Sequence, residues 1–241
     1  MLGKKLLLLS LLLTFLVQSC TIAAEKYYVD SKIKGYEKGE FVILDADDIS
    51  FRERAVDGRV LKVLPHHSLL RVLQLEGDWF KAQSDNLTGY IYAPFTSKGA
   101  KDELTQEDFA QGYAVLGQRF DLAQAEAKLG KAVKLVDDRK HKQKTYTFVS
   151  NVVLVVTKQA VTSIRVYDSK FITMRGVSVG DSAGRAVGQY GLPDGVIYEP
   201  EKTIYEYFLP DDKKKQLRFA LEINSADKVE AFILERVDKA K

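Results

Sequence analysis

The residues with the greatest capacity for chemistry are few in this sequence and poorly placed for it. The chain has three histidines and one cysteine. His66 and His67 are adjacent, and since neighbouring residues of a strand point to opposite faces, we expect their side chains to diverge. His141 lies in a basic stretch, and no further ligands stand at a spacing typical of a metal site. The sequence therefore predicts neither a metal centre nor a cofactor.

The groups needed for hydrolysis are equally sparse. Cys20, the single thiol, falls in the N-terminal leader, which excludes a Cys/His hydrolase. Ser182 lies in GDSAG (residues 180–184), which looks close to a nucleophile elbow, but its simpler role is to cap a helix. Adjacent aspartates at 47–48, 137–138 and 211–212 are expected in solvated loops, whereas a glycosidase needs two carboxylates across a cleft. We predict that the protein is not an enzyme, with an unrecognised cell-wall hydrolase as the catalytic alternative.

Aromatic side chains form the better candidate site. Phe51, Trp79, Tyr90 and Tyr92 come from short apolar segments that a small barrel would bring together. An aromatic groove of this kind can hold an extended peptide. The alternative is that Phe51 and Trp79 are core residues and the tyrosines lie on the surface, since Trp and Tyr serve either role.

The elements that must position these aromatics lie in residues 41–98. Short apolar runs such as FVIL (41–44) and LLRVL (69–73) alternate with turn signals such as EGD (76–78), which predicts a small β-barrel. In order and spacing, ISFR (49–52), VLP (63–65), GDWFKA (77–82) and TGYI (88–91) resemble a bacterial SH3 domain. The resemblance implies an SH3-like barrel that binds an envelope peptide, such as a peptidoglycan stem or cross-bridge, or a protein partner.

The second half of the chain predicts an α+β region. Residues 99–115 are expected to form a connector with a short helix, since Thr105 and Asp108 fit a capping box. Residues 116–237 show two copies of one helix followed by an antiparallel meander. The helices are expected after Asp121 and after Ser182, and each ends at a glycine, Gly130 and Gly191 respectively. The predicted fold class is thus β plus α+β.

This second half also carries a weaker resemblance. GVSVGDS (176–182) followed by YGLPD (190–194) resembles the helix-plus-sheet modules of outer-membrane-assembly lipoproteins and of β-lactamase-inhibitor-like proteins. The resemblance implies a structural or inhibitory lipoprotein acting through this region, which is the alternative function. The aromatics Tyr205, Tyr207, Phe208 and Phe219 are expected in the core, with an outward docking face as the other possibility.

The first 24 residues have the character of a secretory signal. Two lysines precede an apolar run over residues 6–17, which is short for a membrane span. LVQSC (16–20) resembles a lipobox and predicts a lipid on Cys20, which would anchor the protein to an envelope membrane. The alternative is cleavage after Ala23 or Ala24 and a periplasmic or secreted soluble protein. Residues 25–40 are expected to be a tether.

The charge balance gives no reason to expect a nucleic-acid partner. Beyond residue 24 the chain has 34 basic and 33 acidic residues, a net charge of +1. Binding to phosphate backbones requires a basic excess gathered on one face. The sequence therefore favours a non-catalytic binding protein of the cell envelope.

Overall fold

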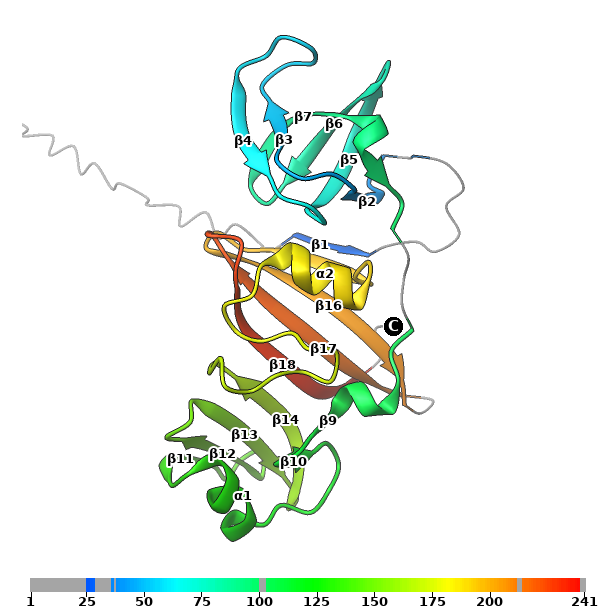
Figure 1. Cartoon of the computed structure of the whole chain (residues 1–241). Coiled ribbons are helices and arrows are strands. Elements are labelled where there is room, and N and C mark those ends of the chain that lie inside the picture. Colours follow the sequence, from blue (N-terminus) through cyan, green and yellow to red (C-terminus); the bar gives the residue numbers. More distant parts are fainter. Residues whose placement is uncertain (1–24, 29–35, 37, 100–102, 212–213, 239–241) are drawn as a thin grey trace, which may run out of the picture.

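The computed structural model describes residues 25–28, 36, 38–99, 103–211 and 214–238, and these ranges are predominantly antiparallel β-structure (Figure 1). Within them the strands form a seven-stranded sheet, a nine-stranded sheet and a two-stranded hairpin, accompanied by two α-helices. The predicted β-rich architecture is therefore confirmed.

The seven-stranded sheet follows the order β4-β3-β7-β6-β5-β2-β8. Its elements are β2 (Phe41–Leu44), β3 (Ile49–Arg52), β4 (Val60–Leu64), β5 (Leu69–Glu76), β6 (Trp79–Ser84), β7 (Leu87–Tyr92), the 3₁₀ helix η1 (Ala93–Phe95) and β8 (Thr96–Ser97). The sheet surrounds a core that includes Phe51, Phe80 and Ile91, all fully buried. The strands do not close into a barrel, because β4 and β8 remain its two ends and β3 pairs with β7 at one position only.

The nine-stranded sheet follows the order β1-β15-β16-β17-β18-β14-β13-β12-β11. Its strands are β1 (Glu25–Tyr28), β11 (Ala132–Asp138), β12 (Gln143–Phe148), β13 (Val152–Thr157), β14 (Ala160–Val166), β15 (Gly195–Tyr198), β16 (Lys202–Pro210), β17 (Lys215–Asn224) and β18 (Val229–Asp238). Two consecutive meanders, β11–β14 and β15–β18, meet where β14 pairs with β18 in antiparallel register. Sequence-distant strands thereby share one continuous sheet.

Each meander is preceded by one short helix with the expected ends. In α1 (Leu122–Leu129), the Asp121 carboxylate accepts a hydrogen bond from the Gln124 N–H at 3.0 Å. In α2 (Ala183–Tyr190), the Ser182 hydroxyl oxygen accepts one from the Arg185 N–H at 3.1 Å. Gly130 and Gly191 end the helices at positive φ, where glycine meets no Cβ penalty. The cap assigned to Ser182 is confirmed.

Two segments differ from the sequence prediction. Residues 25–28, expected in the tether, form β1 and pair with β15 at the edge of the large sheet. The connector contains the 3₁₀ helix η2 (Gln106–Phe109), whose Thr105–Asp108 capping box is present, but no α-helix. Ala110 is already extended, and the chain turns through the β9 (Ala110–Gln111) and β10 (Ala114–Val115) hairpin. The capping box thus begins a single helical turn, which ends where the β9–β10 hairpin begins.

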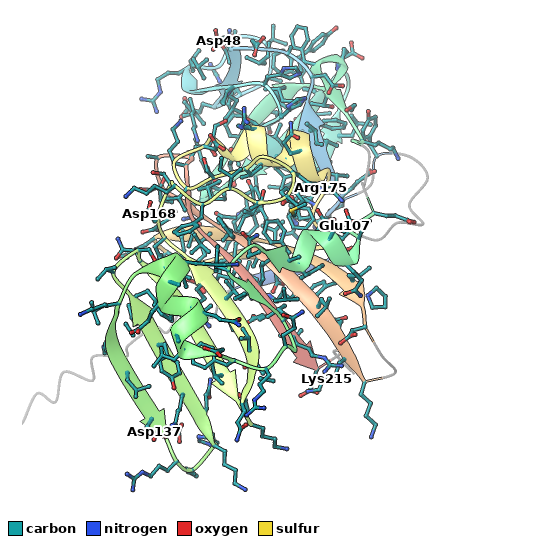
Figure 2. The ribbon with its side chains drawn as sticks, turned by 60° about the horizontal axis from the view of Figure 1, so that its bottom comes forward. Asp48, Glu107, Asp137, Asp168, Arg175 and Lys215 are labelled. Atoms are coloured by element: carbon teal, nitrogen blue, oxygen red, sulfur yellow. The ribbon has the colours of Figure 1, made fainter. Side chains whose placement is uncertain are left out.

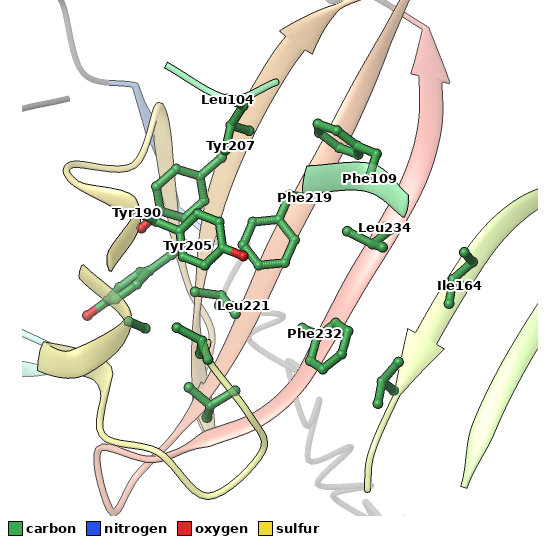
Figure 3. Packing of buried hydrophobic residues seen from close by; sticks show 14 of the residues in the cluster. Leu104, Phe109, Ile164, Tyr190, Tyr205, Tyr207, Phe219, Leu221, Phe232 and Leu234 are labelled. Atoms are coloured by element: carbon green, nitrogen blue, oxygen red, sulfur yellow. The ribbon is translucent and has the colours of Figure 1, made fainter. Parts of the chain in front are cut away.

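The core of the large sheet lies on its helix-bearing face. Tyr207, Phe219 and Leu221 point from β16 and β17 toward Tyr190 of α2, and Phe232 continues the layer on β18 (Figure 3). Tyr205, Tyr207 and Phe219 are all buried, so the expectation that these aromatics belong to the core is confirmed. Phe208 alternates to the opposite face and is only partly buried. Core packing therefore accounts for Tyr205, Tyr207 and Phe219, whereas the core prediction is wrong for Phe208.

Helix α2 lies between the two sheets (Figure 1). Ala186, Val187 and Tyr190 pack in the core of the large sheet. On the side of the small sheet, a Cβ added to Gly184 would lie 2.4 Å from the carbonyl oxygen of His66, so only glycine permits this approach. Side chains of β2 and β5 join the same buried cluster as α2, namely Phe41, Ile43 and Leu69. The two sheets therefore share a hydrophobic core, and Gly184 of α2 allows the close approach of the small sheet.

Candidate peptide-binding surface

The outer face of β6 and β7 presents three of the four aromatics selected from the sequence. Trp79 pairs with Tyr92 and Lys81 with Tyr90 across the two strands, so these side chains lie on one face. All three aromatic side chains are partly exposed, whereas the alternating Phe80 and Ile91 are buried. Successive side chains of a half-buried strand alternate between the core and the solvent, and this alternation places the three aromatics at the surface.

Three of the rings in this region form an aromatic strip, defined here as Trp79, Tyr92 and Phe95. The Trp79 and Tyr92 ring centroids are 5.4 Å apart, and those of Tyr92 and Phe95 are also 5.4 Å apart. The pattern of strand residues does not predict Phe95 as part of this surface. Its signal was Pro94, because the proline starts the η1 turn that returns Phe95 toward Tyr92. Phe95 is 40% exposed, so the strip continues beyond the strands.

Phe51 does not lie in this surface. Its side chain is fully buried in the core of the small sheet. A Cβ added to Gly89 would lie 2.9 Å from Phe51 Cε1, so the glycine of β7 allows the strand to pass directly over the ring. Phe51 therefore supports the sheet from inside, and the alternative role considered for it, that of a core residue, matches its position.

Tyr90 lies beside the strip and is held by Glu76. Its hydroxyl donates a hydrogen bond to Glu76 Oε1 at 3.2 Å. Loss of solvent around the phenol, followed by this hydrogen bond and the negative charge of Glu76, raises the pKa of Tyr90 above its ordinary value. The hydrogen bond to Glu76 fixes the position of the hydroxyl, and Tyr90 presents a polar edge next to the aromatic strip.

The two adjacent histidines do not diverge as predicted. They lie in a turn rather than a strand, with His67 at a φ of 62°, and their rings stack with centroids 3.9 Å apart. His66 Nδ1 is 3.9 Å from Asp47. Among the residues that the structure describes, no group of three or more His, Cys, Asp or Glu side chains is arranged to hold a metal ion.

The paired aspartates belong to separate places. Asp48 and Asp137 lie at opposite ends of the molecule (Figure 2). Asp138 contacts His141 Nδ1 at 2.6 Å, and Asp211 forms an ion pair with Arg236 at 2.5 Å. Asp47 and Asp48 lie in an exposed bend, as expected, but Asp137 and Asp138 belong to strand β11, so the loop prediction is wrong for that pair. Asp212 lies outside the described residues.

Arg175 joins the connector to the segment before α2, a contact with no sequence signal. Its Nε and Nη2 atoms lie 2.8 and 2.9 Å from the two carboxylate oxygens of Asp108, and Nη2 also donates to the Glu103 carbonyl. Burial acts to raise the pKa of Asp108, but hydrogen bonds from Arg175 and Thr105 hold it below its ordinary value. Figure 2 shows Arg175 next to Glu107 of η2. The pair is a structural clamp.

A second buried ion network crosses the face of the large sheet opposite α2. Arg218 of β17 contacts Glu206 of β16 at 2.6 Å and Glu235 of β18 at 2.5 Å. Glu206 is almost fully buried. The Arg218 guanidinium lies between two carboxylates on the neighbouring strands, so the network joins β16, β17 and β18 across this face.

The lipidation candidate Cys20 lies outside the described residues, as does the apolar run at 6–17. Within the described ranges, neither α-helix has the length and apolar character required to cross a membrane.

Comparison with known proteins adds only distant likenesses. No family model matches the sequence, and a search of curated proteins found no match. An extracellular protein containing a SCP domain from Bacillus anthracis aligns with a TM-score of 0.36 and 8% identity, over 59% of this chain and 55% of that chain. A DUF4309 family protein (YjgB) from Bacillus subtilis aligns with a TM-score of 0.33 and 16% identity, over 56% and 86% respectively. This chain thus spans about half the length of the first.

Proposed function

We propose that the protein is a non-catalytic binding protein of the cell envelope, and that it holds an extended peptide on the aromatic strip. The observation that carries the proposal is a set of three neighbouring, partly exposed rings, two on the outer face of β6 and β7 and the third on η1. Rigid aromatic side chains supply large contact area at a small cost in conformational entropy. Peptidoglycan peptide is the preferred ligand and an envelope protein the second, following the bacterial SH3 resemblance.

The proposal includes a finer description of the fold. The seven-stranded sheet is an SH3-like module whose edges have remained open. The units α1 with β11–β14 and α2 with β15–β18 are two copies of one helix-plus-meander repeat. Their identical element order and the pairing of their last strands, β14 with β18, support this description.

We also propose that a lipid on Cys20 attaches the protein to an envelope membrane. The lipobox-like LVQSC sequence supports this location. Mass spectrometry of the mature N-terminus tests it, since a diacylated or triacylated Cys20 is expected. A mature chain beginning at Ala24 or Glu25 would instead establish a soluble exported protein.

Co-sedimentation with purified peptidoglycan tests the binding proposal. The double variant Trp79→Ala/Tyr92→Ala is expected to bind at least about tenfold more weakly than wild type, because truncation of anchor aromatics typically removes about 2 kcal/mol. Tyr167→Ala/Ile172→Ala is the matched control, since both side chains are large and exposed but lie outside the small sheet.

The control variant should sediment with peptidoglycan as wild type does, and both variants should keep the wild-type circular dichroism spectrum. Equal loss of binding in the two double variants would assign retention to general surface stickiness. Absence of wild-type retention would reject peptidoglycan as the ligand.

A further inference from the structure

A pocket of about 410 Å³ opens at the end of the large sheet that carries the β11–β12 hairpin. Tyr146 and Val156 form its floor, and both belong to the core on the helix-bearing face. Phe120 covers one side, with its ring centroid 4.6 Å from that of Tyr146. The backbone N–H of Phe120 donates to the Gln159 carbonyl at 2.8 Å, which fixes this wall against the β13–β14 turn.

The rim of the pocket is cationic. Four basic side chains line it, namely Arg119, Lys142, Lys144 and Lys158. Asp137 is the acidic residue in the same lining. Lys142 and Lys158 come from two hairpin turns at the same end of the sheet, both with left-handed backbone, and the Lys158 N–H donates to the Lys142 carbonyl. The sheet topology therefore gathers charges from separate parts of the sequence.

These cations have no ionic partner within the described part of the chain. Asp137 pairs in register with Lys144 but does not lie within ion-pair distance of it. Other lysines of the same sheet are neutralised, as Lys202 is by Glu222 at 2.9 Å. Four like charges around one cavity repel one another, and an anion inside the cavity would relieve that repulsion.

We propose that this pocket binds a small phosphorylated organic molecule. Its phosphate would lie among the lysines and its planar or apolar part against Phe120 and Tyr146. The pocket volume falls within the usual range of small-molecule sites, roughly 300 to 1,000 Å³. A dianionic phosphate matches the excess of cations better than a single carboxylate does, and an inorganic ion alone would leave the aromatic floor uncovered. This site lies outside the small sheet and is independent of the aromatic strip.

Calorimetric titration of the full-length protein with phenyl phosphate tests the proposal. Inorganic phosphate, benzoate and phenol serve as comparison probes, since each lacks one feature of the expected ligand. Phenyl phosphate should bind at least about tenfold more tightly than any of them, because charge and aromatic contact act together. Phenol or benzoate binding as tightly as phenyl phosphate would overturn the assignment, as would no detectable phenyl phosphate binding at millimolar concentration.

A matched pair of double variants locates the site. Lys142→Gln/Lys144→Gln removes two rim charges and is expected to weaken phenyl phosphate binding about tenfold or more. Lys131→Gln/Lys134→Gln removes the same charge outside the pocket and should change phenyl phosphate affinity less than about twofold. Phe120→Leu should weaken phenyl phosphate binding while leaving inorganic phosphate binding unchanged. Equal weakening by the two double variants would show a general charge effect and overturn the proposal.

Discussion

Gly89 and Phe51 explain the position of the outer aromatics on β7. Because glycine lets β7 pass over the Phe51 ring, the neighbouring Tyr90 and Tyr92 are directed outward. The sequence predicted Trp79, Tyr90 and Tyr92 as neighbours, since strand alternation is visible in the residue order. It did not separate Phe51 from them, because Phe and Trp have similar patterns whether they face the core or the surface.

The side chain of Asp227 provides a prediction about how the stability of the fold depends on pH. It lies in the β17–β18 turn, where burial and then the charge of Asp85 raise its pKa to about 6, while Lys62 and Lys228 act in the opposite direction. The folded state thus favours the protonated carboxyl. The contribution of this group to stability is fully present below its unfolded pKa and is lost as the pH rises through about 6.

The variant Asp227→Asn should therefore be more stable than wild type at pH 7.5, by about 2 kcal/mol in the free energy of unfolding. Asparagine also tolerates the positive φ of 61° at this position. Urea denaturation at pH 7.5 and pH 4 measures the difference, which should disappear at the lower pH. A stability difference that stays the same at both pH values would contradict the assignment to this carboxyl.

At the scale of elements, the helix ends were the most predictable features. Asp121, Ser182, Gly130 and Gly191 are local signals, and each performs the predicted role. The connector was less predictable, because its capping box depends on a distant guanidinium, that of Arg175, and on the hairpin that follows. The pairing of β1 with β15 had no local signal, since residues far apart in the chain determine it.

Helix α2 gives a prediction about close packing. Gly184→Ala should lower the free energy of unfolding by about 2 kcal/mol, because the added methyl meets the His66 backbone carbonyl, which cannot move aside. Gly188→Ala in the same helix is the control. Its methyl would meet the His67 side chain, which has rotational freedom, and the gain in helix propensity is the same.

Chemical denaturation of the two alanine variants measures these effects. The Gly184 variant should be clearly less stable than the Gly188 variant. If both variants were as stable as wild type, α2 would not approach the small sheet as closely as described.

For the molecule as a whole, the shared core predicts cooperative unfolding. Phe41, Ile43 and Leu69 of the small sheet are buried in the same cluster as the core of the large one. Separation of the two sheets would expose these side chains together with the outer side of α2, so neither sheet is expected to remain folded alone. Differential scanning calorimetry should show one transition with equal calorimetric and van't Hoff enthalpies, whereas two resolved transitions would indicate independent domains.

The edge position of β1 has a mechanical consequence. Four residues of β1 pair with β15, beginning at Glu25. A pulling force applied to the chain ahead of Glu25 would reach the protein first through this short strand pair. The hydrogen bonds between β1 and β15 would break first, so the large sheet would lose its edge strand before the load passed along the chain to β2.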